Sequence, residues 1–144
     1  MPSRDYLIRQ FVEMGFFLTS LLRRVLKLKE ENQQEQMESA VKGELLQELK
    51  LDIDQAIILE NDEFLKLAKT YFSSEDQLDK LADILKTLGQ EIEFSFTLNK
   101  ANYLRKALFI FQNLQENSSI FSYDRRIKIL EIQEILLRTG FNQE

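Results

Sequence analysis

Acidic side chains three and four residues apart are the groups in this sequence that could do chemistry. Residues at these spacings share one face of a helix, and carboxylate oxygens are the ligands that Mg²⁺ prefers in proteins. Four clusters have this spacing: Glu35 with Glu38, Glu60 with Glu63, Asp76 with Asp79 and Asp83, and Glu131 with Glu134. Two such clusters on facing helices could together hold one magnesium ion.

Other common catalytic and metal-binding chemistries are not open to the chain. It contains neither histidine nor cysteine, which excludes Ser-His-Asp and Cys-His catalysis, His-ligated zinc, histidine-containing di-iron sites and disulfide bonds. The four glycines, at positions 15, 43, 89 and 140, lie too far apart to form a phosphate-binding loop. Of the chemistries considered, only that of carboxylates is left.

Helical nucleotide pyrophosphohydrolases bind magnesium through an EExxE pattern on one helix and an ExxD pattern on the next. Glu30, Glu31 and Glu35 resemble the first pattern, but their spacing is one residue too long and no matching ExxD follows. Acids at such spacings are also common on the solvated faces of Glu-rich helices, and Lys80 and Lys86 can neutralise the ridge formed by residues 76–83. We therefore predict no catalytic, cofactor-binding or metal-binding residue, and keep a Mg²⁺-dependent nucleotide hydrolase as the alternative.

The overall composition predicts one all-α domain over residues 1–144. The length is close to that of a common single domain, and 44% of the residues are hydrophobic, which is enough for one core. Four glycines and one proline leave little turn chemistry for a multi-stranded sheet, whereas Leu, Glu, Lys and Gln, which favour helices, are frequent.

Apolar spacing and capping residues place the expected helices. They span about residues 3–29, 35–50, 62–72, 74–95, 98–115 and 122–139, with a short helical turn after residue 52 and a turn at 96–97. Five capping signals support these limits: Ser3, Asp52 with Gln55, Asn61, Ser74 with Gln77, and Gly140 at a C-terminus. Residues 92–98 alternate apolar and polar as in a strand, but no second alternating run exists to pair with them.

The stretch MGFFLTSLLRR, residues 14–24, belongs to the first helix rather than to a membrane span or a signal peptide. Only nine uncharged residues separate Glu13 from Arg23, whereas a membrane-spanning helix needs about 20. No small-residue cleavage site follows, and the apolar periodicity continues beyond the stretch. One face of the helix is apolar along its whole length: Leu7, Phe11, Met14, Leu18, Leu21, Leu22, Val25 and Leu28.

The same helix has a second apolar surface, so it must bury more than one side. The favoured interpretation is a central helix that the rest of the chain covers. The second is a contact with a protein partner or a second copy, whose candidate binding residues are Val12, Phe16, Arg23, Arg24 and Lys27. The third is docking on an anionic membrane surface.

Two other apolar regions have a structural and a functional interpretation. Residues 122–139 are apolar on more than one side, which makes them a second place where copies could associate. Tyr103, Phe109 and Phe111 could line a groove for a partner peptide, but their helical spacing fits a core better.

Charge divides the chain into a basic beginning and an acidic remainder. Residues 1–29 carry six bases and two acids, a net charge of +4, while the other 115 residues carry 13 bases and 22 acids, a net charge of −9. We expect the two parts to attract each other within one fold or one dimer. An acidic body would repel phosphates, which argues against nucleic acid as a partner.

Two patterns resemble known helical proteins. Leu78, Leu81, Ala82 and Leu85, followed by Leu104 and Ala107, resemble positions of the tetratricopeptide repeat, although the connection between their helices is too long and the repeat-closing proline is absent. RDYLIRQFVEM, then LLRRVLKLKEE and an acidic helix, resembles a family of functionally uncharacterised small bacterial helical proteins with tetratricopeptide-like hairpins. This resemblance implies a helical-hairpin fold and a bacterial cytoplasmic protein, with no assigned activity.

These observations lead to one expectation for fold and function. The fold is expected to be all-α, with five to six antiparallel helices stacked as hairpins in a tetratricopeptide-like right-handed array. The function is expected to be that of a non-enzymatic helical scaffold or protein-interaction module, which binds a protein partner or itself. We expect a cytoplasmic location, no nucleic acid, no cofactor and no membrane span, with surface contact to a membrane as a minor alternative.

Overall fold

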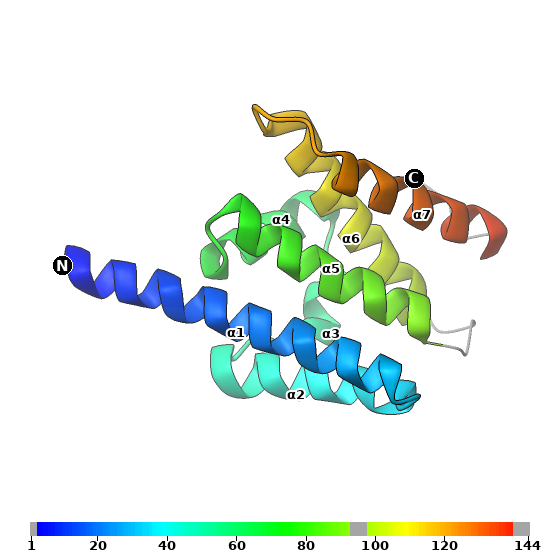
Figure 1. Cartoon of the computed structure of the whole chain (residues 1–144), viewed down its shortest axis with the longest axis horizontal. Coiled ribbons are helices and arrows are strands. Elements are labelled where there is room, and N and C mark those ends of the chain that lie inside the picture. The colour runs from blue at the N-terminus through cyan, green and yellow to red at the C-terminus, as the bar shows by residue number, and fades with distance from the viewer. Residues whose placement is uncertain (1–2, 93–97, 140–144) are drawn as a thin grey trace.

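The computed structural model describes residues 3–92 and 98–139, which form an all-α structure without a strand in those ranges (Figure 1). Seven α-helices lie in the described part of the chain, one more than expected, because the short turn after Asp52 counts as a helix. They are α1 Arg4–Glu30, α2 Met37–Leu49, α3 Ile53–Ala56, α4 Asn61–Tyr71, α5 Glu75–Glu91, α6 Leu98–Asn117 and α7 Tyr123–Thr139, with a 3₁₀ turn, Gln34–Gln36, before α2.

Two of the capping predictions are confirmed by hydrogen bonds. The Ser3 hydroxyl accepts from the Tyr6 amide at the start of α1, and the Ser74 hydroxyl accepts from the Gln77 amide at the start of α5, each at 3.1 Å. Because both hydroxyls satisfy an amide that has no partner within the helix, they fix where α1 and α5 begin.

Two predictions about helix ends are wrong, and a third is right only in part. Asn61 is the first residue of α4 rather than its cap, because its side-chain oxygen accepts from the Lys106 ammonium instead, at 2.9 Å. Asp52 does cap α3, but it accepts from the Asp54 amide, so no capping box with Gln55 forms. The structure ends α5 at Glu91 with Ile92 extended, four residues before the expected end. The predicted turn at 96–97 and the predicted cap at Gly140 lie outside the described residues.

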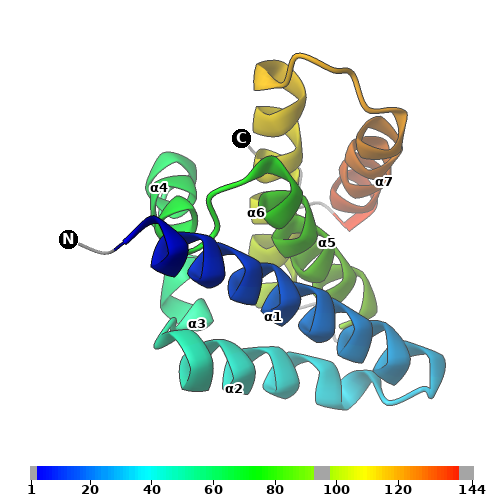
Figure 2. The ribbon, with the colours of Figure 1, turned by 60° about the vertical axis from the view of Figure 1, so that its left-hand side comes forward.

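The core lies around α5 and α6. α5 packs against α1 on one side and α6 on the other, α7 lies against α6, and α2 pairs with the second half of α1 (Figures 1 and 2). Tyr103 and Phe111 of α6 are fully buried and Phe109 packs against the core, so the core interpretation of these aromatics is confirmed. α5 and α6 approach closely at Gly89, where a Cβ atom would lie 2.5 Å from Leu104 Cγ.

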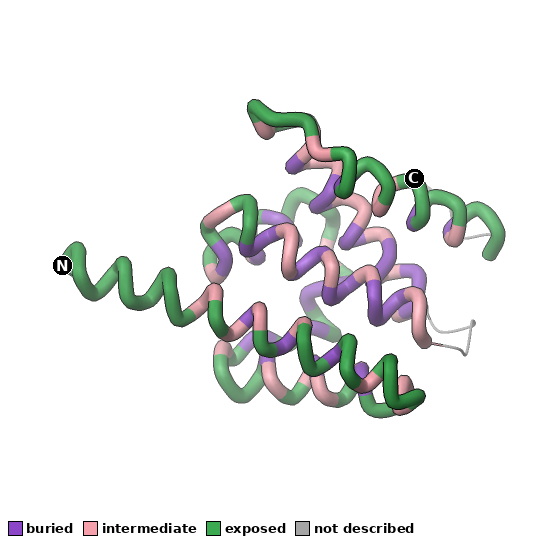
Figure 3. The backbone as a smooth tube through the Cα atoms, viewed as in Figure 1, coloured by how far each residue is buried: buried purple, intermediate pink, exposed green. Residues whose placement is uncertain are grey.

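α1 extends beyond this body. Residues 3–13 are all exposed, while Leu18, Leu21 and Val25 further along the helix are buried, so the first three turns form an arm (Figure 3). We call residues 3–13 the arm from here on. The expectation of a central helix covered by its own chain is therefore wrong for the arm, because the buried side chains of α1 begin only at Leu18.

Candidate interaction surface

Five exposed side chains form a continuous line along α1 on the side away from the core. Successive members are three, four, seven and four residues apart, which keeps them in one row of a helix. We call this row the outer stripe; it consists of Arg9, Val12, Phe16, Arg23 and Lys27. Phe16 is 70% exposed and lies at the centre of the stripe, with Val12 one turn before it. Four of the five residues predicted to bind a partner lie in this stripe.

The basic side chains of the outer stripe are available for contact with a partner. Within residues 3–92 and 98–139, Arg9, Arg23 and Lys27 take part in no ion pair and no side-chain hydrogen bond. Arg24, the fifth predicted partner-binding residue, points to the side and forms an ion pair with Glu44 of α2, at 2.9 Å. The stripe therefore presents positive charge next to an exposed aromatic ring.

Attraction between basic α1 and the acidic body is confirmed at two places. Arg24 contacts Glu44, and Lys29 contacts Glu91 at the end of α5, at 3.3 Å. Both ion pairs are in the second half of α1, where the helix packs on the body. Because these pairs are solvent-exposed, each stabilises the fold by only about 0–1 kcal/mol.

A groove opens between the arm and the end of α4. It has a volume of about 610 Å³ and is lined on one side by Leu7, Phe11 and Met14 of α1, and on the other by Thr70 and Tyr71 of α4. Gln77, at the start of α5, forms its inner end. The buried Gln77 amide donates to the Phe11 carbonyl oxygen at 3.1 Å and accepts from the Ser73 amide at 3.1 Å, which anchors the base of the arm.

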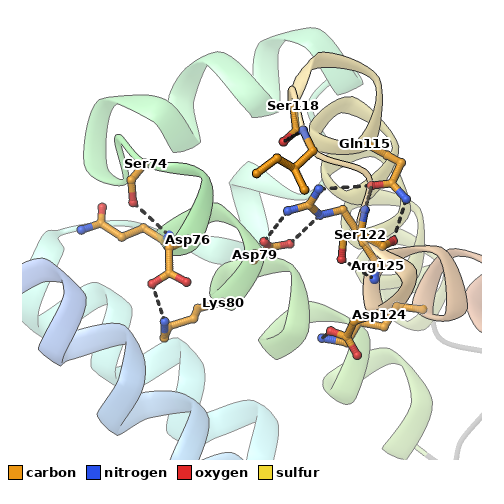
Figure 4. Close-up of polar contacts among 12 residues, drawn as sticks. Ser74, Asp76, Asp79, Lys80, Gln115, Ser118, Ser122, Asp124 and Arg125 are labelled. Carbon is orange, nitrogen blue, oxygen red and sulfur yellow. Dashed lines mark hydrogen bonds and ion pairs between the residues drawn. The ribbon is translucent and has the colours of Figure 1, made fainter.

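The acidic ridge of residues 76–83, which we considered as a magnesium site, is paired with basic side chains. Asp76 binds Lys80 of the same helix, Asp79 accepts two hydrogen bonds from the Arg125 guanidinium of α7 at 3.0 and 2.7 Å, and Asp83 binds Lys128 at 2.7 Å (Figure 4 shows the first two pairs). Asp79 and Asp83 thereby connect α7 to α5.

Hydrogen bonding and burial shift the pKa values of two side chains at the ridge. Hydrogen bonds to Asp79 raise the pKa of Arg125, whose guanidinium also donates to Gln115 at 3.2 Å. Burial raises the pKa of Asp83 above its ordinary value, and the hydrogen bond from Lys128 only partly offsets this rise. Two of the three acids of the ridge therefore form ion pairs between helices, and Asp76 pairs within α5.

The remaining acidic clusters do not converge. Glu131 pairs with Lys86 at 3.0 Å, and Glu38 accepts from the buried Tyr103 hydroxyl at 2.8 Å and lies 3.4 Å from the Lys42 ammonium. Among the described residues, no group of three or more acidic side chains is placed to hold a metal ion.

Two buried lysines of α6 connect helices in a way that the sequence did not indicate. The Lys100 ammonium donates to the carbonyl oxygens of Gly89 and Ile92 and so caps the C-terminal end of α5, and the Lys106 ammonium donates to Asn61 at the start of α4. Burial lowers the pKa of both lysines. Their partners are 11 and 45 residues away in the chain, so spacing along one helix could not reveal these roles.

α7 has the second exposed apolar surface that its sequence predicts. Ile132 and Leu136 are buried against the body, while four large side chains of the same helix face solvent: Tyr123, Ile127, Leu130 and Leu137. Glu131 and Glu134 lie among them. Unlike the arm, this helix is attached to the body along its length by packing on α6 and by its ion pairs to α5.

Comparison with known proteins adds no relative to this description: no family model, no curated protein and no solved structure matches the chain. No helix in the described part of the chain is both long and apolar enough to cross a membrane. The exposed surfaces of α1 are therefore the features from which a function can be inferred.

Proposed function

We propose that the chain is a non-enzymatic protein-interaction module that binds its partner through the outer stripe of α1. The observation that carries this proposal is Phe16, a phenylalanine 70% exposed near the middle of α1, directly before the turns that pack on the body. Aromatic side chains on a rigid element are typical anchors of protein interfaces.

The chemistry of the stripe indicates the kind of partner. Burying an apolar side chain of this size contributes about 1.5 to 3 kcal/mol, so Phe16 with Val12 could supply the apolar centre of a contact. Arg9, Arg23 and Lys27 surround that centre and have no ion-pair partner in the described part of the chain. The partner is therefore an acidic surface or acidic helix that offers an apolar pocket, and its association should weaken as salt is added.

The body is well suited to hold the outer stripe of α1 in place. α1 with α2 and α5 with α6 lie as neighbouring helix pairs, and this arrangement supports our inference that the fold is a stack of hairpins of the tetratricopeptide type (Figure 2). In this role the acidic body keeps the basic stripe oriented and accessible, and the module needs no bound ion or substrate to work.

Affinity purification of the tagged full-length chain from its native cells, followed by mass spectrometry, tests the proposal. Phe16→Glu places a charge at the centre of the stripe, and Ile58→Glu is the matched control, because Ile58 is equally exposed, at 65%, on a different surface. We expect a stoichiometric partner that is recovered with wild type and Ile58→Glu and lost with Phe16→Glu, while circular dichroism shows equal helix content in all three.

Other outcomes of the purification would contradict the proposal. A partner that survives Phe16→Glu would bind elsewhere on the molecule. If no protein is recovered, sedimentation with anionic vesicles distinguishes the remaining use of the stripe: binding that is lost at high salt and in Arg23→Glu with Lys27→Glu would place the stripe on a membrane surface instead.

A further inference from the structure

The inner side of α1 carries a regular seven-residue repeat. Its apolar side chains alternate at spacings of four and three residues over the whole helix: Leu7, Phe11, Met14, Leu18, Leu21, Val25 and Leu28. Such a repeat forms a seam against which another helix packs with interlocking side chains. We call these seven residues the seam. It lies on the opposite side of the helix from the outer stripe.

Only the second half of the seam is covered. Leu18, Leu21 and Val25 are buried against the body, and Leu28 packs against the same core. In the first half, Leu7 is 52% exposed and Phe11 is 46% exposed, although their spacing continues the pattern without a break. The arm therefore offers the same kind of helix-binding surface that the body already occupies two turns later.

The groove beside the arm is lined mainly by large side chains of α1 and by the end of α4. Leu7, Phe11 and Met14 of α1 form one wall, and Thr70 with Tyr71 of α4 forms the opposite wall. It is open to solvent and contains no ion pair across it among the described residues. A helix in this position would lie alongside the arm and continue the packing that α1 begins with the body.

We propose that the occupant is the arm of a second copy of this chain, so that two arms pair antiparallel along their seams and each fills the groove of the other. The net charge of the arm does not oppose this pairing. The arm carries Arg4 and Arg9 against Asp5 and Glu13, a net charge of zero, so two arms do not repel each other. Ile8 and Gln10, which flank the seam, are uncharged. A two-fold symmetric pair also covers both grooves at once.

The buried half of the seam determines the register. Leu18 is fully buried in the body, so it cannot contact a second copy, and the overlap is restricted to the residues before it. In the antiparallel register that satisfies this limit, Leu7 of each copy faces Phe11 of the other. Because two such short arms form a small interface, the dimer is weak and depends on protein concentration.

Sedimentation equilibrium of the full chain over a wide concentration range tests the dimer. Wild type should change from one chain of 17.1 kDa to two as concentration rises. The double variant Leu7→Glu with Phe11→Glu should weaken dimerisation at least about a hundredfold, because it places four charges in one small apolar contact. Both positions are exposed in the single chain, so the variant should fold, as circular dichroism would verify.

Phe16→Glu is the matched control, since Phe16 lies on the outer stripe, and it should leave dimerisation unchanged. This control also separates the two proposals, because the outer stripe binds a different partner by a different face. Wild type that stays monomeric up to about 1 mM would overturn the dimer proposal. So would a dimer that is indifferent to Leu7→Glu with Phe11→Glu, or one that Phe16→Glu also abolishes.

Cross-linking tests the orientation of the arms. The chain has no cysteine, so single cysteines can be introduced without a background. In the proposed register position 4 of one copy faces position 14 of the other. Mixed Arg4→Cys and Met14→Cys chains should form a disulfide-linked pair, whereas a parallel arrangement would link each variant to itself and would overturn the antiparallel register.

Discussion

At the scale of single residues, acidic side chains with the spacing of metal ligands instead form ion pairs between helices. The Arg125 guanidinium is almost completely buried and meets both oxygens of Asp79, a geometry that matches the planar fork of arginine to a carboxylate (Figure 4). Such a pair is costly to break, because the charge that remains is buried without compensation. It therefore determines how α7 sits on α5.

Asp79→Ala should consequently lower the free energy of unfolding by about 2 to 4 kcal/mol. Asp76→Ala removes the neighbouring ion pair with Lys80, but Asp76 is 81% exposed, so this control should cost less than about 1 kcal/mol. Urea denaturation of the two variants measures both values. Equal losses would show that Asp79 and Arg125 are no better coupled than a surface pair.

Tyr103 provides a second prediction at this scale, through its ionisation. Burial, and then the hydrogen bond to Glu38, raise the pKa of this hydroxyl well above its ordinary value of 10.0. Since the folded state holds the proton more tightly, this group's contribution to stability is complete below pH 10.0 and is lost as pH rises towards the folded-state pKa.

The absorbance at 295 nm of wild type minus that of Tyr103→Phe isolates this one side chain during an alkaline titration. No tyrosinate signal should appear in the difference while the chain is folded at about pH 11. It should appear together with the loss of helical circular dichroism. A difference signal that develops near pH 10 in the folded chain would mean that the hydroxyl is accessible to solvent.

At the scale of elements, two glycines inside helices have opposite roles. Gly89 of α5 lies against Leu104 of α6, so an added Cβ at 2.5 Å would push two buried helices apart. Gly43 of α2 has no atom within 4 Å of the place where a Cβ would lie. The first glycine permits close packing, and the second only lowers the helix propensity of α2.

Gly89→Ala should therefore destabilise the chain by about 1 to 3 kcal/mol, even though alanine favours a helix. Gly43→Ala should stabilise it by about 0.5 to 1 kcal/mol, because nothing has to move and the unfolded chain loses flexibility. Thermal or urea unfolding would give both signs. If Gly89→Ala were also stabilising, α5 and α6 would not be in close contact at this point.

How far the sequence could predict an element depended on how local its signal was. Ser74 placed the start of α5 correctly, since its hydroxyl accepts from the amide of Gln77, only three residues away. The end of α5 depends on Lys100, which reaches back from α6 to the carbonyl oxygens of Gly89 and Ile92. Periodicity along one helix contains no information about such a contact, and the predicted end was four residues too late.

At the scale of the whole molecule, the candidate site was predictable only in part. Helical spacing correctly placed Val12, Phe16, Arg23 and Lys27 on one face of α1. It could not show that Leu7 and Phe11 are exposed while Leu18 and Val25 are buried, because all four have the same spacing. Whether an apolar face is covered depends on where the other helices end, and this follows from tertiary packing.

This difference along α1 predicts uneven protection of its backbone amides from hydrogen exchange. Residues 18–28 pack on the body, so their hydrogen bonds should open only with a large part of the fold, whereas the arm can fray alone. In dilute solution, amides of residues 7–14 should exchange much faster than those of residues 18–28. Mass spectrometry of overlapping peptides measures both segments in one experiment.

Concentration then distinguishes a free arm from a paired one. If two arms pair, exchange in residues 7–14 should slow as protein concentration rises, because the paired population grows by mass action while residues 18–28 change little. Leu7→Glu with Phe11→Glu should abolish this slowing, and Phe16→Glu should not. An arm that is equally protected at every concentration would instead be a stable helix on its own, and the uncovered half of the seam would then need no second copy.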